Sequence, residues 1–321
     1  MEKHGSAPIL ASIDLGSHTA RMLIARWIEE TSTLKPLLRR RTYVRLARDF
    51  EAAEARTIKG PALDRTIRCL KEYRRIGEAF DLSFIQVVAT GVVREALNRE
   101  EVIRRIRQET DLPVRLLSGE EEAAITALGI SRALDVGNNP FVAFDLGGGS
   151  TEFFLAGRQN PRVLSIPLGA AVLTERYLVS DPPLEEEVER ARARIRELLM
   201  QSALGDFARE PFSLVGTGGT VTALTAMVYG IGAGEIDPER MNGLVLEREP
   251  VEELFLRMRR MPLGERLAAP GLDPGRAEVI LGGTLAVLEI LKYFDAPETM
   301  VSLSDLLEGT LYERLGYSLI P

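Results

Sequence analysis

Two loops in the sequence combine an aspartate, glycines and hydroxyl side chains, a combination suited to binding phosphate. The first loop follows Asp14, the second follows Asp145, and the two segments align without a gap. The loop residues are Gly16, Ser17, His18 and Thr19 in the first segment and Gly147, Gly148, Gly149, Ser150 and Thr151 in the second. Glycines let the backbone approach a ligand, successive N–H groups form a nest for an anion, and hydroxyls add donors. The repeat therefore favours two related phosphate loops over two ordinary hairpin turns.

A third glycine loop has a different setting. It follows an apolar run at 212–215 and precedes a helical pattern at 221–229. Its candidate binding residues are Gly216, Gly218, Gly219 and Thr220. A loop between a strand and a helix presents backbone donors at the helix N-terminus, where anions bind. The sequence contains neither a P-loop nor a dinucleotide-binding fingerprint in its proper context, which excludes a standard P-loop ATPase or dehydrogenase.

The elements that position these loops alternate between helix and strand. Apolar runs on both sides of each aspartate loop predict a strand, a tight turn and a second strand. Further helices are predicted at 61–79, 99–109, 120–133, 184–204, 276–294 and 305–315, and strands at 84–89, 113–117 and 162–167. This alternation is typical of an α/β protein, and the repeated loop indicates two related domains that face each other across a cleft.

Composition excludes several classes of protein. The chain has 321 residues, which is enough for two domains, and a net charge of −7 without a basic stripe argues against non-specific nucleic-acid binding. One cysteine and two histidines exclude an internal disulfide and a histidine-rich metal site. We find no transmembrane stretch or secretory signal, so we expect a cytoplasmic protein that does not bind membranes.

Seven segments, in order along the chain, resemble motifs of the Ppx/GppA phosphatase family, which comprises exopolyphosphatases and guanosine pentaphosphate phosphohydrolases. They are Ile13–Ser17, Val44–Leu46, Ala89–Ala96, Ser118–Ala123, Asp145–Glu152, Gly216–Thr220 and Arg276–Ile280. The resemblance implies an α/β fold with two ribonuclease H-like domains around a central cleft, as in actin, Hsp70 and sugar kinases. We expect domain I at 1–130 plus a C-terminal helix at 305–321, and domain II at 131–304. The chain resembles the short members of the family, which lack an added C-terminal helical region.

The same resemblance implies roles for individual residues. Glu122 is the expected general base, although three glutamates at 120–122 would also suit the first turn of any helix. Arg94 is expected to bind the phosphate that is cleaved, and Glu152 to orient the water or the metal. Asp145 and Glu152 are the expected ligands of Mg²⁺, with Mn²⁺ as a substitute.

Further contacts with the substrate are expected from charged residues beside the loops. Asp14 is the counterpart of Asp145 in the first repeat, and Arg21 and Arg276 are expected to contact anions. The expected substrates are inorganic polyphosphate or guanosine pentaphosphate (pppGpp), which would be converted to ppGpp. A homodimer is expected by analogy with the family alone.

Three positions depart from the family pattern and leave the function open. His18 replaces an asparagine, Asn242 replaces a histidine, and Leu307 replaces an arginine. The loss at Leu307 would remove a cation from the ligand side or from an interdomain salt bridge. Our first hypothesis is a Mg²⁺-dependent phosphoanhydride hydrolase. The alternatives are a regulatory protein that binds nucleotide or polyphosphate without hydrolysis, and a sugar kinase or actin-like ATPase.

Overall fold

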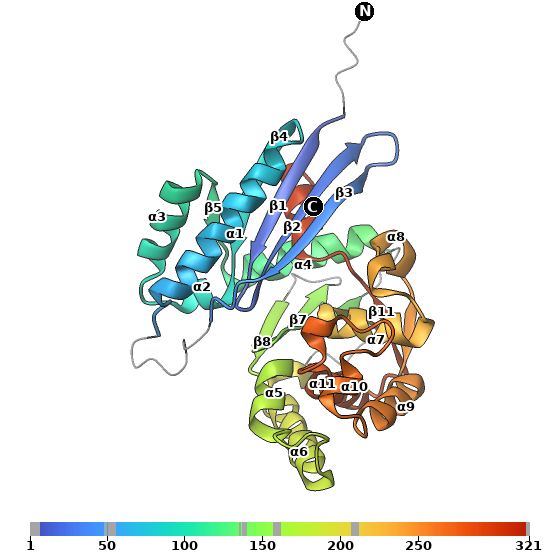
Figure 1. Ribbon diagram of the computed structural model, residues 1–321. Helices are drawn as coiled ribbons and strands as arrows, with labels where there is room; N and C mark the ends of the chain where they lie inside the picture. The colour runs from blue at the N-terminus through green and yellow to red at the C-terminus, as the bar shows by residue number, and fades with distance from the viewer. Residues whose placement is uncertain are drawn as a thin grey trace, which may run out of the picture. The chain divides into compact units, whose positions relative to one another are not determined.

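The computed structural model describes residues 7–47, 50, 56–134, 136, 140–156, 162–206 and 212–318 (Figure 1). The chain divides into two compact units. Unit 1 combines Met1–Arg132 with Leu306–Leu319, and unit 2 comprises Ala133–Asp305. The end of the predicted C-terminal helix, at 319–321, lies outside the described residues.

Unit 1 is built on a mixed sheet of five strands. They are β1 (Ile9–Leu15), β2 (Thr19–Ile28), β3 (Thr33–Tyr43), β4 (Leu82–Ala89) and β5 (Val114–Leu116). Their order across the sheet is β3-β2-β1-β4-β5. β1 pairs with β2 in antiparallel fashion and with β4 in parallel, and β5 continues the parallel part. The three parallel strands therefore end at the same edge of the sheet.

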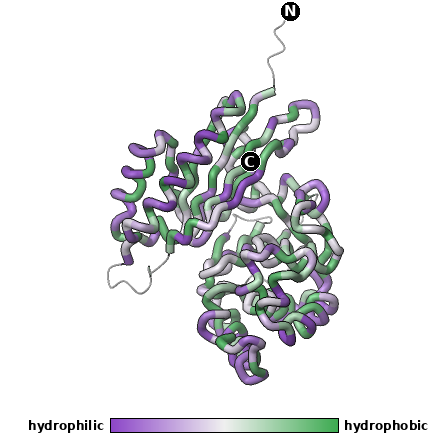
Figure 2. Tube along the Cα trace, viewed as in Figure 1, coloured by the Kyte–Doolittle hydropathy of each residue, from purple (hydrophilic) through white to green (hydrophobic). Residues whose placement is uncertain are grey.

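Helices cover both faces of this sheet. On one face, α1 (Gly60–Glu78) and α3 (Arg99–Thr110) pack their apolar residues on β1, β2 and β4. On the other face, α4 (Gly119–Ala133) and α12 (Leu306–Arg314) bury Ile125, Leu306 and Leu307. α2 (Gly91–Glu95) is a short helix directly after β4. Figure 2 shows the pattern behind this packing, since hydrophobic residues follow the strands and hydrophilic ones follow the outer turns of the helices.

Unit 2 repeats the topology of unit 1. Its strands are β6 (Phe141–Leu146), β7 (Thr151–Ala156), β8 (Arg162–Ile166), β9 (Ser213–Thr217), β10 (Val245–Glu247) and β11 (Glu298–Val301). Their order across the sheet is β10-β11-β9-β6-β7-β8. Read from β8 to β11, five of these strands are arranged like β3-β2-β1-β4-β5 of unit 1, and β10 is an additional strand at the edge. The turn is repeated as well: Gly16 N donates to Thr19 O at 3.0 Å and Gly147 N donates to Ser150 O at 2.9 Å. The predicted α/β fold and the duplicated hairpin are confirmed.

The core of unit 2 surrounds one buried helix. Its helices are α5 (Ala170–Tyr177), α6 (Glu185–Gln201), α7 (Gly219–Tyr229), α8 (Pro238–Met241), α9 (Arg248–Met258), α10 (Leu263–Arg266) and α11 (Ile280–Tyr293). α11 is apolar on all sides, and its single acidic residue, Glu289, is buried. Arg192 and Arg196 from α6 each donate to Glu289 at 2.6 Å, which satisfies the buried carboxylate.

Several elements were not predicted or have other bounds than predicted, and α5, α9, β10 and β11 are among the unpredicted ones. β3 was not predicted, because three consecutive arginines interrupt its apolar pattern. α11 begins at Ile280 rather than at 276, so Arg276 lies in a short 3₁₀ turn, Pro274–Arg276. The last helix, α12, ends at Arg314. None of the helices in the described part of the chain is long and apolar enough to cross a bilayer.

Candidate active site

Several residues predicted to act in catalysis or phosphate binding lie at one edge of the unit 1 sheet. This is the edge where the parallel strands β1, β4 and β5 end. Hydrogen bonds join the segments that leave this edge: Thr90 N donates to Leu15 O at 3.4 Å, and Leu117 N donates to Ala89 O at 3.0 Å. The first phosphate loop follows β1, α2 follows β4, and α4 follows β5. In α/β sheets, this edge is where ligands bind.

Arg94 of α2 and Glu122 of α4 are in direct contact. Arg94 Nη1 donates to Glu122 Oε2 at 2.7 Å and to Leu117 O at 3.2 Å. The Arg94 side chain is 30% exposed and that of Glu122 is 15% exposed. Nε and Nη2 of Arg94 make no hydrogen bond to the described residues, so the guanidinium can still offer donors to a phosphate oxygen.

The first turn of α4 is fixed by a capping box next to Glu122. Ser118 N donates to Glu121 Oε2 at 2.8 Å, and Glu121 N donates to Ser118 Oγ at 3.1 Å. Arg115 donates to Glu121 at 2.8 Å and to Glu313 of α12 at 2.5 Å. These bonds from Arg115 and from the Ser118 backbone hold the pKa of the Glu121 carboxyl below its ordinary value. Glu121 therefore has a structural role, and Glu122 is left with its carboxylate towards Arg94.

The first phosphate loop lies beside α2. A Cβ placed on Gly91 would lie 3.7 Å from Ser17 Oγ, so the loop and the start of α2 are close. Asp14 is 6% exposed, and its Oδ2 accepts bonds from Arg21 Nε at 2.9 Å and Nη2 at 2.7 Å. His18 is exposed, and its ring meets that of Tyr43 at 5.6 Å.

In unit 2, the second phosphate loop brings two carboxylates together. Asp145 and Glu152 are directly opposite each other on β6 and β7, so their side chains lie on the same face of the sheet. Glu152 Oε1 accepts hydrogen bonds from Ser150 Oγ at 2.6 Å and Ser165 Oγ at 3.0 Å. These two serines orient the Glu152 carboxylate beside Asp145.

The third loop completes this edge of unit 2. Thr217 ends β9 opposite Asp145, and its Oγ1 is buried without a hydrogen-bond partner among the described residues. Gly218 has a φ of 89°, and a Cβ there would lie 2.5 Å from Asp145 Oδ1. A Cβ on Gly219 would overlap the guanidinium of Arg276, which places that cation at the N-terminus of α7.

Three of the residues predicted to bind phosphate also contact the core of unit 2. The Thr151 hydroxyl is buried and donates to Leu168 O at 2.5 Å. Gly216 lies against the Phe144 ring, which a Cβ would approach to 3.0 Å, and Thr220 is buried with its hydroxyl against Gly283. These residues shape the loops but direct no side-chain donor away from the core.

Two of the three positions that depart from the family pattern make defined contacts within their units. Asn242 Oδ1 accepts from Leu303 N at 2.7 Å and its amide donates to Ser304 Oγ at 3.2 Å, which braces the segment before α12. Leu307 is 3% exposed and packs on Leu10 and Leu23 of unit 1. The leucine therefore fills the core under α12.

The donor set suits a magnesium ion held by few protein ligands. The described residues contain no group of three or more histidine, cysteine, aspartate or glutamate side chains placed to hold a metal. Asp145 and Glu152 nevertheless lie side by side, and the buried Thr217 hydroxyl adds an oxygen at the same place. Mg²⁺ is commonly bound by one or two carboxylates and keeps waters and substrate oxygens as its other ligands. The residues present fit that ion.

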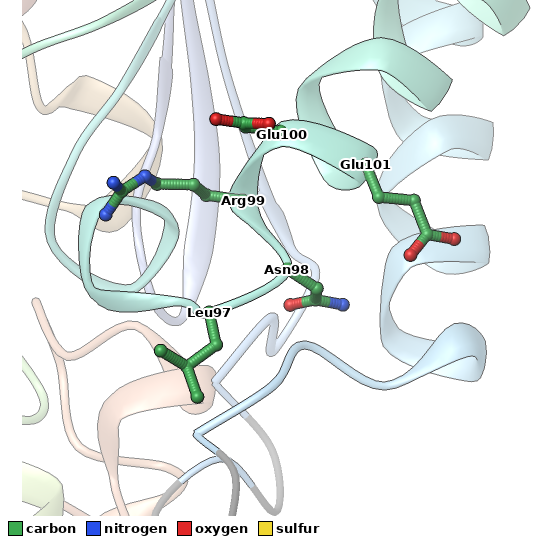
Figure 3. A pocket seen from close by; sticks show the side chains of 5 residues that line it. All are labelled: Leu97, Asn98, Arg99, Glu100 and Glu101. Carbon is green, nitrogen blue, oxygen red and sulfur yellow. The ribbon is translucent and has the colours of Figure 1, made fainter.

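The surface pocket drawn in Figure 3 is a separate feature. It has a volume of about 350 Å³ and is lined by Leu97, Asn98, Arg99, Glu100 and Glu101 at the start of α3. Asn98 exchanges two hydrogen bonds of 3.0 Å with the backbone of Ile58, so it supports the fold. None of the predicted site residues lines this pocket.

We predict that Gly218→Ala weakens Mg²⁺ binding. An alanine would be strained at this positive φ, and its Cβ would displace the Asp145 carboxylate. We expect the Mg²⁺ concentration for half-maximal activity, and the dissociation constant from calorimetry, to rise about tenfold. Gly230→Ala is the matched control, since Gly230 has a φ of 65° and open space around it. Equal Mg²⁺ affinity in the two variants would contradict the placement of the metal.

Comparison with known proteins agrees with this architecture. The model of the Ppx/GppA phosphatase family matches residues 23–318. Exopolyphosphatase 2 of Mycobacterium tuberculosis is 31% identical over 321 residues, which cover 96% of this chain and 98% of the relative. The crystal structure of the Aquifex aeolicus Ppx/GppA family member superposes with a TM-score of 0.80 at 30% identity, over 96% of this chain and 97% of that one.

A longer relative contains the same region as one part. The bifunctional 3-dehydroquinate synthase/phosphatase of Fusobacterium nucleatum is 29% identical over 98% of this chain but only 47% of its own length. The chain thus spans about half of that relative and nearly all of the exopolyphosphatase. The family model matches nearly the whole length of the chain, and the two α/β units share one topology. The chain therefore belongs to the Ppx/GppA phosphatase family.

Proposed function

We propose that the protein hydrolyses the terminal phosphoanhydride bond of inorganic polyphosphate in a Mg²⁺-dependent reaction, and that pppGpp is a second candidate substrate. The observation that carries the proposal is the contact of 2.7 Å between Arg94 and Glu122. It joins a cation that can bind a phosphate to a carboxylate that can accept a proton. The similarity to exopolyphosphatase 2, which extends over both full lengths, favours polyphosphate as the first substrate to test.

The proposed chemistry in unit 1 is the attack of water on the terminal phosphorus. The water oxygen forms the new P–O bond, the bridging P–O bond breaks, and Glu122 accepts the water proton. The shortened chain leaves with the negative charge of the broken bond. Arg94 orients the terminal phosphate and stabilises the charge on its oxygens, which is the main task of a protein in phosphoryl transfer.

Unit 2 by itself carries groups suited to holding a metal ion and a phosphate. Asp145 and Glu152 would hold the Mg²⁺, which supplies positive charge for the phosphate oxygens. Arg276 lies at the N-terminus of α7. Guanidinium groups and helix N-termini both bind anions, so we assign a substrate phosphate to this position.

The test is phosphate release from long-chain polyphosphate and, separately, from pppGpp, each with Mg²⁺ and with EDTA. We expect release from polyphosphate with Mg²⁺ and none after chelation. Release from pppGpp alone would show that pppGpp, and not polyphosphate, is the substrate. Release that persists in EDTA would contradict the role of the metal. Tight binding of either compound without any release would support a regulatory protein instead of a hydrolase.

A further inference from the structure

Arg115 on the edge strand β5 joins two carboxylates that belong to different helices. Its Nη2 donates to Glu121 Oε1 of α4 at 2.8 Å, and its Nη1 donates to Glu313 Oε2 of α12 at 2.5 Å. Because each carboxylate is bonded to a different nitrogen of the planar guanidinium, the Arg115 side chain is held in one orientation between the two helices.

The place of Arg115 in the sheet explains why it meets α4 and α12. Arg115 is paired with Val88 of β4, and Val88 packs in a buried cluster with Ile125 of α4 and Leu306 of α12. Successive side chains of a strand point to opposite faces, and paired residues share a face. Arg115 therefore lies on the face that α4 and α12 cover, whereas the preceding Val114 packs with the α3 side of the sheet.

The first turn of α4 is attached to β5 at two points. Leu117 and Ser118 are the only residues between the strand and the helix, which is the attachment through the chain. The second attachment is Glu121, whose Oε1 accepts from Arg115 while its Oε2 accepts from Ser118 N in the capping box. The carboxylate that closes the first turn is thus the same one that Arg115 holds.

The rotation of this turn decides where Glu122 points. Successive residues of an α-helix lie about 100° apart around its axis. Glu121 and Glu122 accordingly meet two different neighbours, Arg115 on β5 and Arg94 on α2. A rotation that carried Glu121 away from Arg115 would also carry Glu122 away from Arg94. Two adjacent glutamates bonded to arginines on two separate elements therefore fix the rotation of the turn.

We propose that Arg115 is a positioning residue for Glu122: by holding Glu121, it keeps the Glu122 carboxylate in contact with Arg94. This role rests on the proposed function, in which Glu122 accepts the proton of the attacking water. Arg115 lies outside every segment that resembles the family motifs, so its role follows from these contacts alone.

The test compares Arg115→Gln with Arg105→Gln, which breaks a similar bridge elsewhere in unit 1. Arg105 of α3 donates to Asp64 at 2.9 Å and to Glu109 at 2.8 Å, and its side chain is 29% exposed against 31% for Arg115. We expect Arg115→Gln to lower kcat for polyphosphate about tenfold with little change in KM, because it misplaces the base and keeps the phosphate contacts. Arg105→Gln should change neither constant by more than about twofold. Arg115→Lys should have an intermediate kcat, because lysine keeps the charge and loses the planar fork.

Two further variants test whether Arg115 acts through Glu121. Glu121→Gln keeps the capping box, in which glutamine can replace glutamate, but removes the charged oxygen that Arg115 holds. We expect Arg115→Gln to lower kcat by no more than about twofold when it is added to Glu121→Gln. A full further loss of kcat in this double variant would overturn the proposal. An equal loss of kcat in Glu313→Gln would overturn it as well, since that substitution breaks only the bond to α12.

Crystal structures of the wild-type protein and of the two arginine variants separate this role from the proposed hydrolysis. We expect Glu122 Oε2 to lie beyond hydrogen-bond distance of Arg94 Nη1 in Arg115→Gln and to keep its contact in Arg105→Gln. If the wild-type protein releases no phosphate but the contact is lost in Arg115→Gln alone, hydrolysis is wrong and the positioning role stands. If the contact is kept in both variants, Arg115 does not position Glu122 and the proposal fails, whatever the activity.

Discussion

Glu122→Gln is expected to lower the rate of phosphate release by about a thousandfold while substrate binding changes little. Glutamine has the shape of glutamate and can still accept a hydrogen bond from Arg94, but it cannot take the proton from water. General base catalysis contributes about 10²–10⁴-fold to enzymatic rates, which sets the size of the effect. The measurement is kcat for polyphosphate at saturating Mg²⁺, together with the dissociation constant of polyphosphate.

The matched control for this substitution is Glu120→Gln on the same helical turn. Glu120 is exposed at the start of α4, so its change removes one charge without touching the pair of Arg94 and Glu122. We expect Glu120→Gln to retain kcat within about twofold. If Glu122→Gln kept more than a tenth of the activity, Glu122 would not be the base. If both variants lost activity equally, the acidic turn as a whole would be responsible.

The duplicated hairpin carries different charges in the two units. In unit 1, the residue opposite the aspartate at the end of the first strand is Arg21, and in unit 2 it is Glu152. The same backbone position thus holds a cation beside Asp14 and an anion beside Asp145. A neutralised aspartate suits a phosphate-binding edge, whereas two adjacent carboxylates suit a cation. In the proposed reaction, this one change of residue type would separate a phosphate-binding half from a metal-binding half.

The repeat and the alternation of elements could be predicted because they are local patterns. The strand–turn–strand segments at Asp14 and Asp145 need only apolar runs and glycines, and both are found as expected. The pairing of Arg94 with Glu122 could not be derived from their separation of 28 positions. It depends on β1, β4 and β5 ending at one edge, which is a property of the sheet and not of any single segment.

The sequence is less informative where a residue's role depends on its neighbours in space. At Leu307 it indicates only the loss of a cation, and the structure adds that the leucine side chain packs in the core of unit 1. The neighbouring Glu308 receives its cation from Arg39 of β3. β3 itself was missed because its arginines resemble a solvated segment, although an edge strand tolerates such charge.

Gly309→Ala is expected to destabilise unit 1 by about 3 kcal/mol, because a Cβ at this position would overlap the carbonyl oxygen of Ile125 on α4. A backbone atom cannot move aside as a flexible side chain can, so α12 and α4 must separate. Their shared cluster of Val88, Leu117, Ile125 and Leu306 would then open. Since Ile125 lies one turn after Glu122 on α4, we expect phosphate release to fall together with stability.

Urea unfolding can follow this change through the single tryptophan of the chain. Trp27 of β2 contacts Tyr312 of α12, so its fluorescence reports whether α12 is packed on the unit 1 sheet. Gly60→Ala at the start of α1 is the matched control, since nothing lies within 4 Å of its added Cβ. There alanine reduces the freedom of the unfolded chain, and we expect a gain of up to about 1 kcal/mol. Opposite shifts of the two midpoints would show that contact with α4, and not the loss of a glycine, sets the position of α12; equal shifts would refute that close packing.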